Sequence, residues 1–497
     1  MDLSVVLSRA LTGIDAPLVR VETHLSNGLP AFNIVGLPET TVRESKDRVR
    51  CAIINSYFDF PDRRITINLA PADLPKEGGR FDLPIALGIL TASGQIPQDR
   101  LLAHEFLGEL ALDGAIRAVP GCVAAAVAAS DAQRTLVMEI DNAATAALVP
   151  GSRILGAADL LTLAAHLNGA VTLAPTQPLA PKTQRDYPDL GEVIGQEAAR
   201  RALEIAASGG HSLLFTGPPG TGKTLLASRL PGILPDLQAR EALQVLAIRD
   251  IQRNAGQIPA LFERPFRNPH HSASPAALAG GGSRPQPGEI SLAHGGVLFL
   301  DELPEFSRHC LEMLREPLES GEITLSRARY KATYPARFQL VAAMNPCPCG
   351  FLGDPEKACR CSPDQIQRYH GRISGPFLDR IDLHVPVVRL PTGRLLQADG
   401  GGESSSEVRA RVAATIDRQL QRQGCTNARL KPEQLILRCA MPSRQRQFLE
   451  HAAERMHLSG RSVHRVLKVA RTIADMAQAK CVDGEHIREA LAYRAPV

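Results

Sequence analysis

The sequence predicts a multidomain α/β protein, and three short apolar runs carry that prediction. Residues 212–216 precede a glycine-rich loop, residues 297–300 precede Asp301 and Glu302, and residues 338–344 precede Asn345. Short, largely apolar runs are typical of buried strands in a parallel sheet, and the carboxyl ends of such strands line the ligand crevice. We therefore expect a parallel-sheet α/β core with these polar residues gathered at one edge.

The glycine-rich loop predicts a nucleoside triphosphate site. It leads directly into a helical stretch and reads Gly217-Pro218-Pro219-Gly220-Thr221-Gly222-Lys223-Thr224. The glycines let backbone N–H groups converge on phosphates, Lys223 neutralises the outer phosphates, and the Thr224 hydroxyl can hold Mg²⁺. All eight residues are candidate ATP-binding residues, and ATP and Mg²⁺ are the expected cofactors.

The residues after the other two runs complete a hydrolytic site. We expect Asp301 to join Thr224 in holding Mg²⁺ and Glu302 to orient and polarise the attacking water. Asn345 is expected between the γ-phosphate and that water, the position known as sensor 1. Together the three runs specify the AAA+ class of ring ATPases, so the chain is predicted to be an ATP hydrolase.

Two further arginines are candidates for a role in hydrolysis. Arg380 lies in a segment, Gly375 to Asp382, that resembles the AAA+ segment carrying an arginine finger, a side chain that stabilises transition-state charge in a neighbouring subunit's site. A finger requires a homo-oligomer, most simply a closed ring, and we expect a hexamer. A surface Arg–Asp pair is the open alternative. Arg461 is the candidate for sensor 2, with Arg465 as the fallback.

Four cysteines predict a metal site inside the core. Cys347 and Cys349 form one Cys-x-Cys pair, and Cys359 and Cys361 form a second pair nine residues further on. Four thiolates this close in a reducing compartment match a tetrahedral structural Zn²⁺ site. Unligated thiols and an iron–sulfur cluster remain the alternatives.

Composition and linker patterns predict the solubility, the location and the domain boundaries of the chain. With 497 residues, 44% hydrophobic residues and a net charge of +4, the chain is predicted to be soluble, to hold several domains and to lack a generally basic surface. The N-terminus has no secretory signal pattern and no apolar run is long enough to cross a membrane, which predicts a cytoplasmic protein. Prolines and small polar residues indicate a linker, and the expected segments are an N-terminal domain at 1–170, the linker at 171–188, the ATPase core at 189–395 with a Cys-rich insert at 347–361, and a helical lid at 396–497.

Longer motifs make the resemblance more specific. Residues 210–214, 268–272 and 372–380 resemble the Mg-chelatase-like branch of AAA+, and residues 35–40, 75–84 and 469–475 resemble the ComM/YifB family. The resemblance covers nearly the whole chain. It implies an ATP-driven, ring-shaped DNA motor or helicase that promotes branch migration during homologous recombination and natural transformation, acting on single-stranded or branched DNA without sequence preference and alongside other recombination proteins.

The resemblance also implies a fold for the N-terminal domain, an α+β fold like the proteolytic domain of Lon. Lon-type proteolysis needs a serine activated by a lysine. The corresponding positions here fall near Arg80 and Val123, neither of which can fill those roles. We therefore expect a non-proteolytic domain that binds DNA or a partner protein.

The predicted hairpin at 321–334 carries the candidate DNA contacts. Arg327, Arg329 and Lys331 recur at period two, so on one strand they would share a face. In related ATPases a hairpin before sensor 1 points into the pore, where cations can track phosphates. A solvated edge strand protected by charge is the alternative. A motor subunit of a metal chelatase and a protein-remodelling ATPase remain alternative functions, and the polymer or partner that stimulates ATP hydrolysis distinguishes them.

Overall fold

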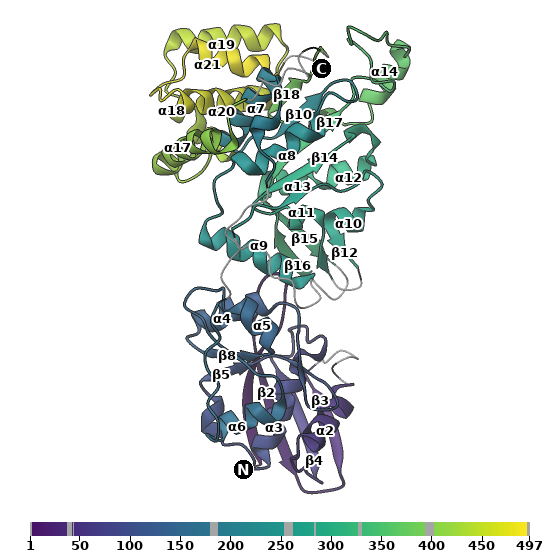
Figure 1. Ribbon diagram of the computed structural model, residues 1–497, viewed down its shortest axis with the longest axis vertical. Coiled ribbons are helices and arrows are strands. Elements are labelled where there is room, and N and C mark those ends of the chain that lie inside the picture. Colours follow the sequence, from purple (N-terminus) through teal and green to yellow (C-terminus); the bar gives the residue numbers. More distant parts are fainter. Residues whose placement is uncertain are drawn as a thin grey trace.

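The computed structural model describes residues 2–36, 42, 44–178, 187–252, 262–282, 285–326, 331–391, 393 and 402–494. The molecule is elongated, with the first part of the chain at one end, the parallel sheet in the middle and the C-terminal helices at the other end (Figure 1). The N-terminal part contains β1 (Leu3–Arg9), β2 (Leu18–Ser26), β3 (Ala31–Val35), α2 (Ser45–Asn55), β4 (Arg64–Ala70), α3 (Asp82–Ala92), β5 (His104–Phe106), β6 (Glu109–Leu110), β7 (Ile116–Arg117), α4 (Cys122–Asp131), β8 (Thr135–Met138), α5 (Ile140–Ala146), β9 (Arg153–Gly156) and α6 (Leu160–Leu167).

The N-terminal part is built on two small sheets. The first has the order β1-β2-β4-β3, in which only β3 and β4 run parallel, and the second is the parallel sheet β5-β8-β9. Alternating exposure along β4 matches the alternating sequence that predicted it. Helix α3 is buried along its whole length and packs on β1 and β2. This arrangement is mixed α/β, and the likeness to Lon stays a prediction.

The middle of the molecule holds the predicted parallel sheet. Its elements are α7 (Glu197–Gly209), β10 (Leu213–Thr216), α8 (Lys223–Ile233), α9 (Ala239–Ile251), β11 (Phe266–Arg267), α10 (Pro275–Ala279), β12 (Gly280–Gly281), β13 (Gln286–Pro287), α11 (Glu289–Leu292), β14 (Val297–Leu300), α12 (Arg308–Met313), α13 (Arg315–Ser320), β15 (Glu322–Ser326), β16 (Lys331–Pro335), β17 (Gln339–Met344), α14 (Pro363–His370), α15 (Gly375–Leu378) and β18 (Leu383–Pro386). The strand order is β11-β14-β17-β10-β18, and every neighbouring pair is parallel.

The three apolar runs form the three central strands of this sheet. Every residue of β10, β14 and β17 is buried, which explains why the runs show no polar alternation. Because the strands are parallel and adjacent, their carboxyl ends lie at one edge. The phosphate loop, Asp301 and Asn345 therefore meet there, as the sequence predicted.

The predicted hairpin is present in the described residues. Strand β15 ends at Ser326, which pairs with Lys331, the first residue of β16. Arg327 and Arg329 lie outside the described residues, so a shared face for Arg327, Arg329 and Lys331 stays a prediction. Lys331 is exposed.

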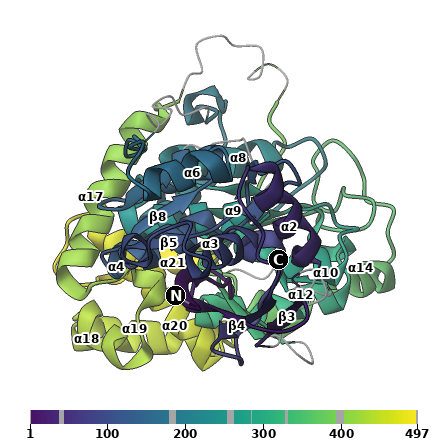
Figure 2. The same cartoon turned by 90° about the horizontal axis from the view of Figure 1, so that it is seen from below.

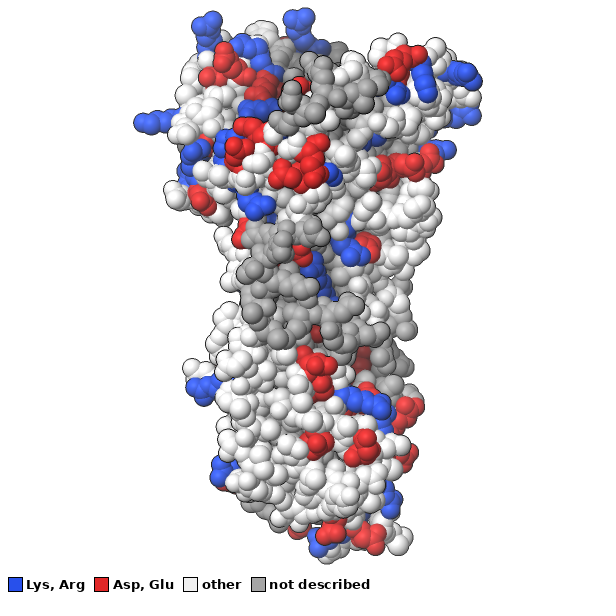
Figure 3. Space-filling model, viewed as in Figure 1, with Lys and Arg blue, Asp and Glu red and all other residues white. Residues whose placement is uncertain are grey.

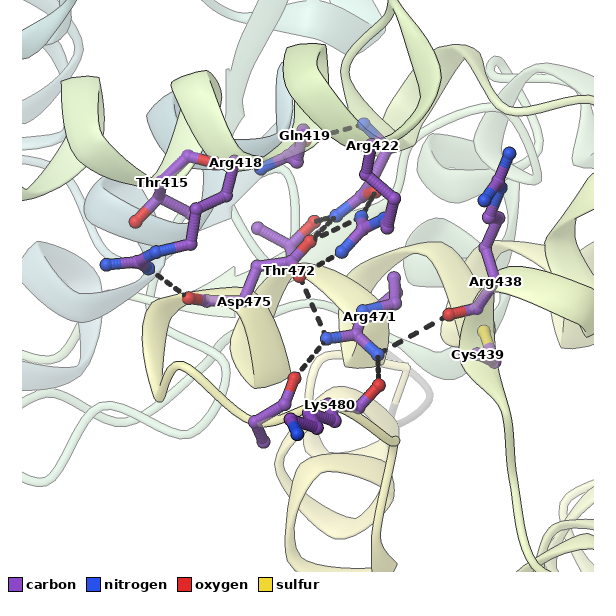
Figure 4. A network of polar contacts seen from close by, with 12 residues as sticks. Thr415, Arg418, Gln419, Arg422, Arg438, Cys439, Arg471, Thr472, Asp475 and Lys480 are labelled. Carbon is purple, nitrogen blue, oxygen red and sulfur yellow. Dashed lines mark hydrogen bonds and ion pairs between the residues drawn. The ribbon is translucent and has the colours of Figure 1, made fainter.

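The C-terminal part is helical, as predicted. It consists of α17 (Ser405–Gln423), α18 (Pro432–Cys439), α19 (Ser443–Arg455), α20 (Gly460–Met476) and α21 (Gly484–Ala492). A buried polar network ties α17 to α20, with Asp475 accepting from Arg422 and Arg471 (Figure 4). Arg471 is 1% exposed, and the backbone oxygens of Ala479 and Lys480 also accept from its terminal guanidinium nitrogens. Seen from below, α17, α18 and α19 lie on one side of the molecule and α14 lies on the other (Figure 2).

One carboxylate joins the N-terminal part to the core. Asp250, near the end of α9, accepts hydrogen bonds from the Cys122 thiol (3.4 Å) and the Val123 N–H (3.1 Å), which open α4. A carboxylate is favourable at the positive N-terminal end of a helix. Arg80 lies in the same region: burial lowers its pKa to about 10, although the charge of Asp250 opposes that shift. Arg80 and Val123 thus both lie close to Asp250 of the ATPase core.

The surface agrees with the modest net charge. On the face drawn in Figure 3, positive and negative side chains of the described residues are interspersed, with no extended patch of one sign. No described helix combines the length and apolar character needed to span a membrane.

Candidate nucleotide-binding and hydrolysis site

The phosphate loop links β10 to α8 and has the form of a phosphate cradle. Helix α8 begins at Lys223, and Gly220 and Gly222 have φ values of 77° and 88°. A Cβ atom at either glycine would meet nothing within 4 Å, so the space above the loop is open. Backbone N–H groups at the start of a helix favour an anion, and these residues therefore fit a bound phosphate.

Lys223 lies across the loop and contacts sensor 1. Its Nζ donates to the backbone oxygens of Gly217 (2.7 Å) and Pro218 (2.9 Å) and to Oδ1 of Asn345 (3.1 Å). Burial lowers the pKa of Lys223, while Asp301 and Glu302 favour its charged form. The lysine and the asparagine are thus already in contact at the place where a γ-phosphate would lie.

The two predicted Mg²⁺ ligands also meet. The Thr224 hydroxyl donates to Oδ2 of Asp301 at 2.7 Å, and the Asp301 Oδ1 accepts from the backbone N–H of Glu302 at 2.9 Å. A hydroxyl and a carboxylate oxygen are ligands that Mg²⁺ accepts, with water and phosphate completing its octahedron. The pair therefore fits the metal that ATP brings.

Glu302 has an unusual backbone and a partner that sequence reasoning missed. Its φ is 52°, in the left-handed region, where a side chain costs free energy. Oε2 of Glu302 lies 3.1 Å from Nδ1 of His271, and the His270 and His271 rings are 4.1 Å apart. The adjacent histidines were visible in the sequence, but nothing there pointed to this carboxylate.

Arg380 and Arg461 are not part of this cluster. The Arg380 side chain is 6% exposed and pairs with Oε1 of Glu319 at 2.6 Å, while also donating to the backbone oxygen of Pro376. Arg461 is exposed in the first turn of α20. The Ser462 hydroxyl donates to Oδ1 of Asp379 at 3.4 Å, so the start of α20 lies beside the segment that carries Arg380. Their roles as finger and sensor 2 stay predictions.

A chain of buried polar contacts holds α20 in this position. Arg465, the fallback for sensor 2, pairs with Oδ1 of Asp382 at 2.6 Å. His211 bridges Asp382, at 3.4 Å, and the Thr472 hydroxyl, at 2.7 Å. Buried charge is tolerated only when it is paired in this way. Arg465 is thus engaged inside the subunit, whereas Arg461 is exposed.

The four predicted metal ligands come together. The sulfur atoms of Cys347, Cys349, Cys359 and Cys361 all lie within 4.8 Å of one another. The three closest pairs are 3.4 to 3.6 Å apart, close to the roughly 3.8 Å expected between thiolates of a tetrahedral zinc site with bonds of about 2.3 Å. Backbone N–H groups of Arg360 and Phe351 lower the pKa of Cys349 to about 6, which favours the thiolate that a metal binds.

Comparisons with known proteins agree with this site. Residues 189–395 match the family "Magnesium chelatase, subunit ChlI", residues 21–142 match "Subunit ChlI of Mg-chelatase", and residues 402–494 match "Magnesium chelatase, subunit ChlI C-terminal". The 38 kDa subunit of magnesium chelatase from Rhodobacter capsulatus is 26% identical over a stretch that covers 38% of this chain and 56% of that protein.

Two relatives match over the whole chain. Competence protein ComM of Haemophilus influenzae is 50% identical, and the match covers 100% of this chain and 98% of that protein. The uncharacterized protein YifB of Escherichia coli is also 50% identical, with 100% and 97% covered. Together with a parallel-sheet core that carries the phosphate loop, these matches establish that the chain belongs to the ComM/YifB family of Mg-chelatase-like AAA+ proteins.

Proposed function

We propose that this chain is an ATP-driven ring motor on DNA, acting in the cytoplasm and promoting branch migration during homologous recombination and natural transformation. The observation that carries the proposal is the full-length identity of 50% with a competence protein, in a chain whose hydrolytic residues meet at one edge of the sheet. The family by itself indicates ATPase activity. The polymer on which the ATPase acts is the proposed part.

The chain's own residues account for hydrolysis. Bound Mg²⁺–ATP supplies the phosphoanhydride bond whose hydrolysis releases energy. Lys223 would exchange its loop oxygens for phosphate oxygens, and Thr224 and Asp301 would hold Mg²⁺. Glu302 accepts a hydrogen bond from water and aligns it with the phosphorus, while Asn345 holds that water from the other side.

In a ring, a neighbouring subunit would supply the remaining positive charges of the hydrolytic site. Arg380 and the start of α20 lie side by side through the contact between Asp379 and Ser462. Both arginines are therefore available to the same neighbouring subunit, whose γ-phosphate they would reach in a hexamer. For Arg380 this requires release from Glu319, whose carboxylate is half exposed.

The hairpin is the proposed DNA contact. Lys331 is the exposed first residue of β16 and pairs with Ser326, and in the sequence Arg327 and Arg329 precede it by four and two residues. Three cations on one hairpin can follow a phosphate backbone without reading bases, which suits single-stranded or branched DNA of any sequence.

Zinc is the proposed metal of the four-cysteine site. Its ligand set is all sulfur and the sulfur spacing fits a tetrahedron, which favours Zn²⁺ over metals that prefer oxygen. When bound, zinc supplies a rigid cross-link and no redox chemistry. Cys347, Cys349, Cys359 and Cys361 would hold it.

Steady-state ATP hydrolysis tests the proposed motor. The purified protein is assayed without DNA and with linear duplex, single strands or a four-way junction, with Lys223→Ala as the control for contaminating activity. We expect strong stimulation by single-stranded or branched DNA. Activity that no DNA changes would contradict the motor and direct attention to a chelatase-like or protein-remodelling partner.

A further inference from the structure

The four-cysteine segment is packed directly against the phosphate loop. Gly350, between the two cysteine pairs, is buried with φ of 84°. A Cβ atom placed on it would lie 2.7 Å from Cδ of Pro219 and 3.8 Å from Cγ of Asn345. A Cβ atom has no room beside Pro219, so the backbone of the cysteine segment is in contact with the phosphate loop.

A second contact fixes the same segment on the other side of the loop. Asp354 accepts from Arg389, whose guanidinium lies 3.1 Å away, just beyond β18. The chain beside Arg389 supports the phosphate loop: a Cβ atom at Gly217 would lie 2.1 Å from the backbone oxygen of Val387. The backbone oxygen of Val388 also accepts from Gln196, which donates to the oxygen of Thr221 as well.

The third link runs through the chain itself. Asn345, which accepts from Lys223, is separated from the first cysteine only by Pro346. The backbone oxygen of Pro346 accepts from the His370 ring at the end of α14, at 2.8 Å. Sensor 1, the phosphate loop and the cysteine segment thus form one contiguous group of residues.

We propose that a metal bound by the four cysteines forms a structural wall of the nucleotide site, so that metal and nucleotide stabilise each other's binding. The inference rests on the zinc site proposed above. A tetrahedral metal cross-links the segment and fixes Gly350 against Pro219. Without the metal, no cross-link joins the two cysteine pairs, and only contacts such as that of Asp354 with Arg389 hold the segment. The backbone of Gly350 is then no longer fixed against the phosphate loop.

Thermodynamic linkage gives the proposal two measurable sides. If the metal raises nucleotide affinity by some factor, the nucleotide must raise metal affinity by the same factor. Couplings between protein sites are typically about 5- to 150-fold. The effect of the nucleotide on metal affinity can be measured without any hydrolysis, so this measurement is independent of the motor activity.

The first experiment measures the zinc affinity of the wild-type protein. Zinc content is determined by elemental analysis, and the distribution of zinc at equilibrium between the protein and the colorimetric chelator 4-(2-pyridylazo)resorcinol is then measured with and without Mg²⁺ and a non-hydrolysable ATP analogue. We expect the analogue to raise the zinc affinity of the protein by at least about fivefold. It should have no effect in Lys223→Ala, which keeps the cysteines but not the phosphate contacts.

Two glycines of the same segment provide matched variants. Gly350→Ala inserts a methyl group against Pro219, whereas Gly353→Ala adds one where nothing lies within 4 Å, and both positions have positive φ. The backbone strain is therefore similar and only the contact differs. We expect Gly350→Ala to keep its zinc, to bind the analogue at least about fivefold more weakly and to lose the effect on zinc affinity. Gly353→Ala should retain both.

The outcomes separate the proposals. Equal zinc affinities with and without the analogue in the wild type would overturn the coupling. Nucleotide affinities of Gly350→Ala and Gly353→Ala that agree would overturn the role of the Gly350 contact. If the protein is purified without metal and takes up no zinc, the proposed zinc site would be contradicted as well. The DNA-stimulated ATPase assay decides the motor separately from all three.

Discussion

Glu302 is the residue whose position most directly indicates function. Its left-handed backbone is unusual for a side chain of this size, and such conformations persist where the surrounding structure enforces them. Here β14 ends at Leu300, and Leu303 and Pro304 immediately beyond are buried, which fixes the chain on both sides of Glu302. The carboxylate itself is exposed and lies at the edge where the phosphate loop opens.

Glu302→Gln is expected to stop hydrolysis while leaving nucleotide binding intact. The amide keeps the shape of the side chain but cannot accept a proton from water, and loss of a general base costs about 10²- to 10⁴-fold in rate. Lys223→Ala should lose nucleotide affinity as well. Steady-state ATPase rates and binding of a fluorescent ATP analogue check both. A Glu302→Gln protein with near-normal turnover would remove Glu302 from the site.

Arg380 needs a control because it also has a partner inside the subunit. Arg380→Ala is expected to lower the hydrolysis rate by about 10³-fold or more, as for other arginine fingers, with nucleotide affinity nearly unchanged. The same change also breaks the ion pair with Glu319. Glu319→Gln breaks that pair but keeps the arginine, so it should retain hydrolysis. If both variants lose activity equally, the arginine acts through its structural pair.

At the scale of elements, sequence reasoning succeeded where one strand or loop carries the whole signal. The central strands, the phosphate loop and the cysteine pairs are local patterns, and burial or chain geometry forces them into the predicted arrangement. The hairpin was also recognised, but its register, with Ser326 opposite Lys331, could not be predicted because a period-two spacing is compatible with either strand. Register depends on pairing and not on spacing alone.

The contacts that could not be predicted join elements distant in the chain. Asp250 binds the start of α4 from more than a hundred residues away, and Gly350 meets Pro219 across the sheet edge. An aspartate near a helix end and a glycine after a cysteine are common, so neither carries a signal by itself. Only the fold shows which partner each one has.

His294 connects three elements and makes stability depend on pH. Its Nδ1 accepts from the N–H of Arg337 ahead of β17, and its Nε2 lies 3.1 Å from Oε1 of Gln244 on α9. Burial lowers its pKa to about 4, and the charges of Arg337 and Arg429 act in the same direction. The ring is therefore neutral in the folded protein, whereas in the unfolded chain it takes up a proton below about pH 6.5.

The sign follows from this difference in protonation. The contribution of His294 to stability is complete above about pH 6.5 and is lost as the pH falls towards 4, by up to about 3 kcal/mol. His294→Asn keeps an acceptor for Arg337 but does not titrate, so its free energy of unfolding should fall less over that range. Denaturant unfolding from pH 7 to 4 measures this, with exposed His309→Asn as the control. Parallel curves for wild type and His294→Asn would contradict the assignment.

At the scale of the whole molecule, the N-terminal part is attached to α9 and to the hairpin of the ATPase core. Asp250 lies on α9, and Gly13 of the N-terminal part approaches the backbone of Thr333 in the hairpin so closely that a Cβ atom would lie 2.6 Å from its oxygen. Ala247 and Leu246 of α9 pack into the same apolar cluster as α4. A displacement of the hairpin or of α9 would therefore be transmitted directly to the N-terminal part, which lies next to both (Figure 1).

The proposed ring predicts that two inactive variants regain ATPase activity when they are mixed. Each site would combine the phosphate loop of one subunit with Arg380 of the next, as in any head-to-tail closed assembly. In a mixture of Lys223→Ala and Arg380→Ala subunits, some interfaces pair an intact lysine with an intact arginine. Random assembly of equal amounts gives about a quarter of such interfaces.

Hydrolysis should therefore reappear when the two variants are mixed under conditions that allow subunit exchange. The ATPase rate is measured against the mixing ratio, and a maximum near equal amounts is expected because competent interfaces need one subunit of each kind. The double variant Lys223→Ala/Arg380→Ala, mixed with either single variant, supplies only one of the two side chains and should restore nothing. Mixtures that stay as inactive as their parts, although subunits exchange, would show that Arg380 acts within its own subunit.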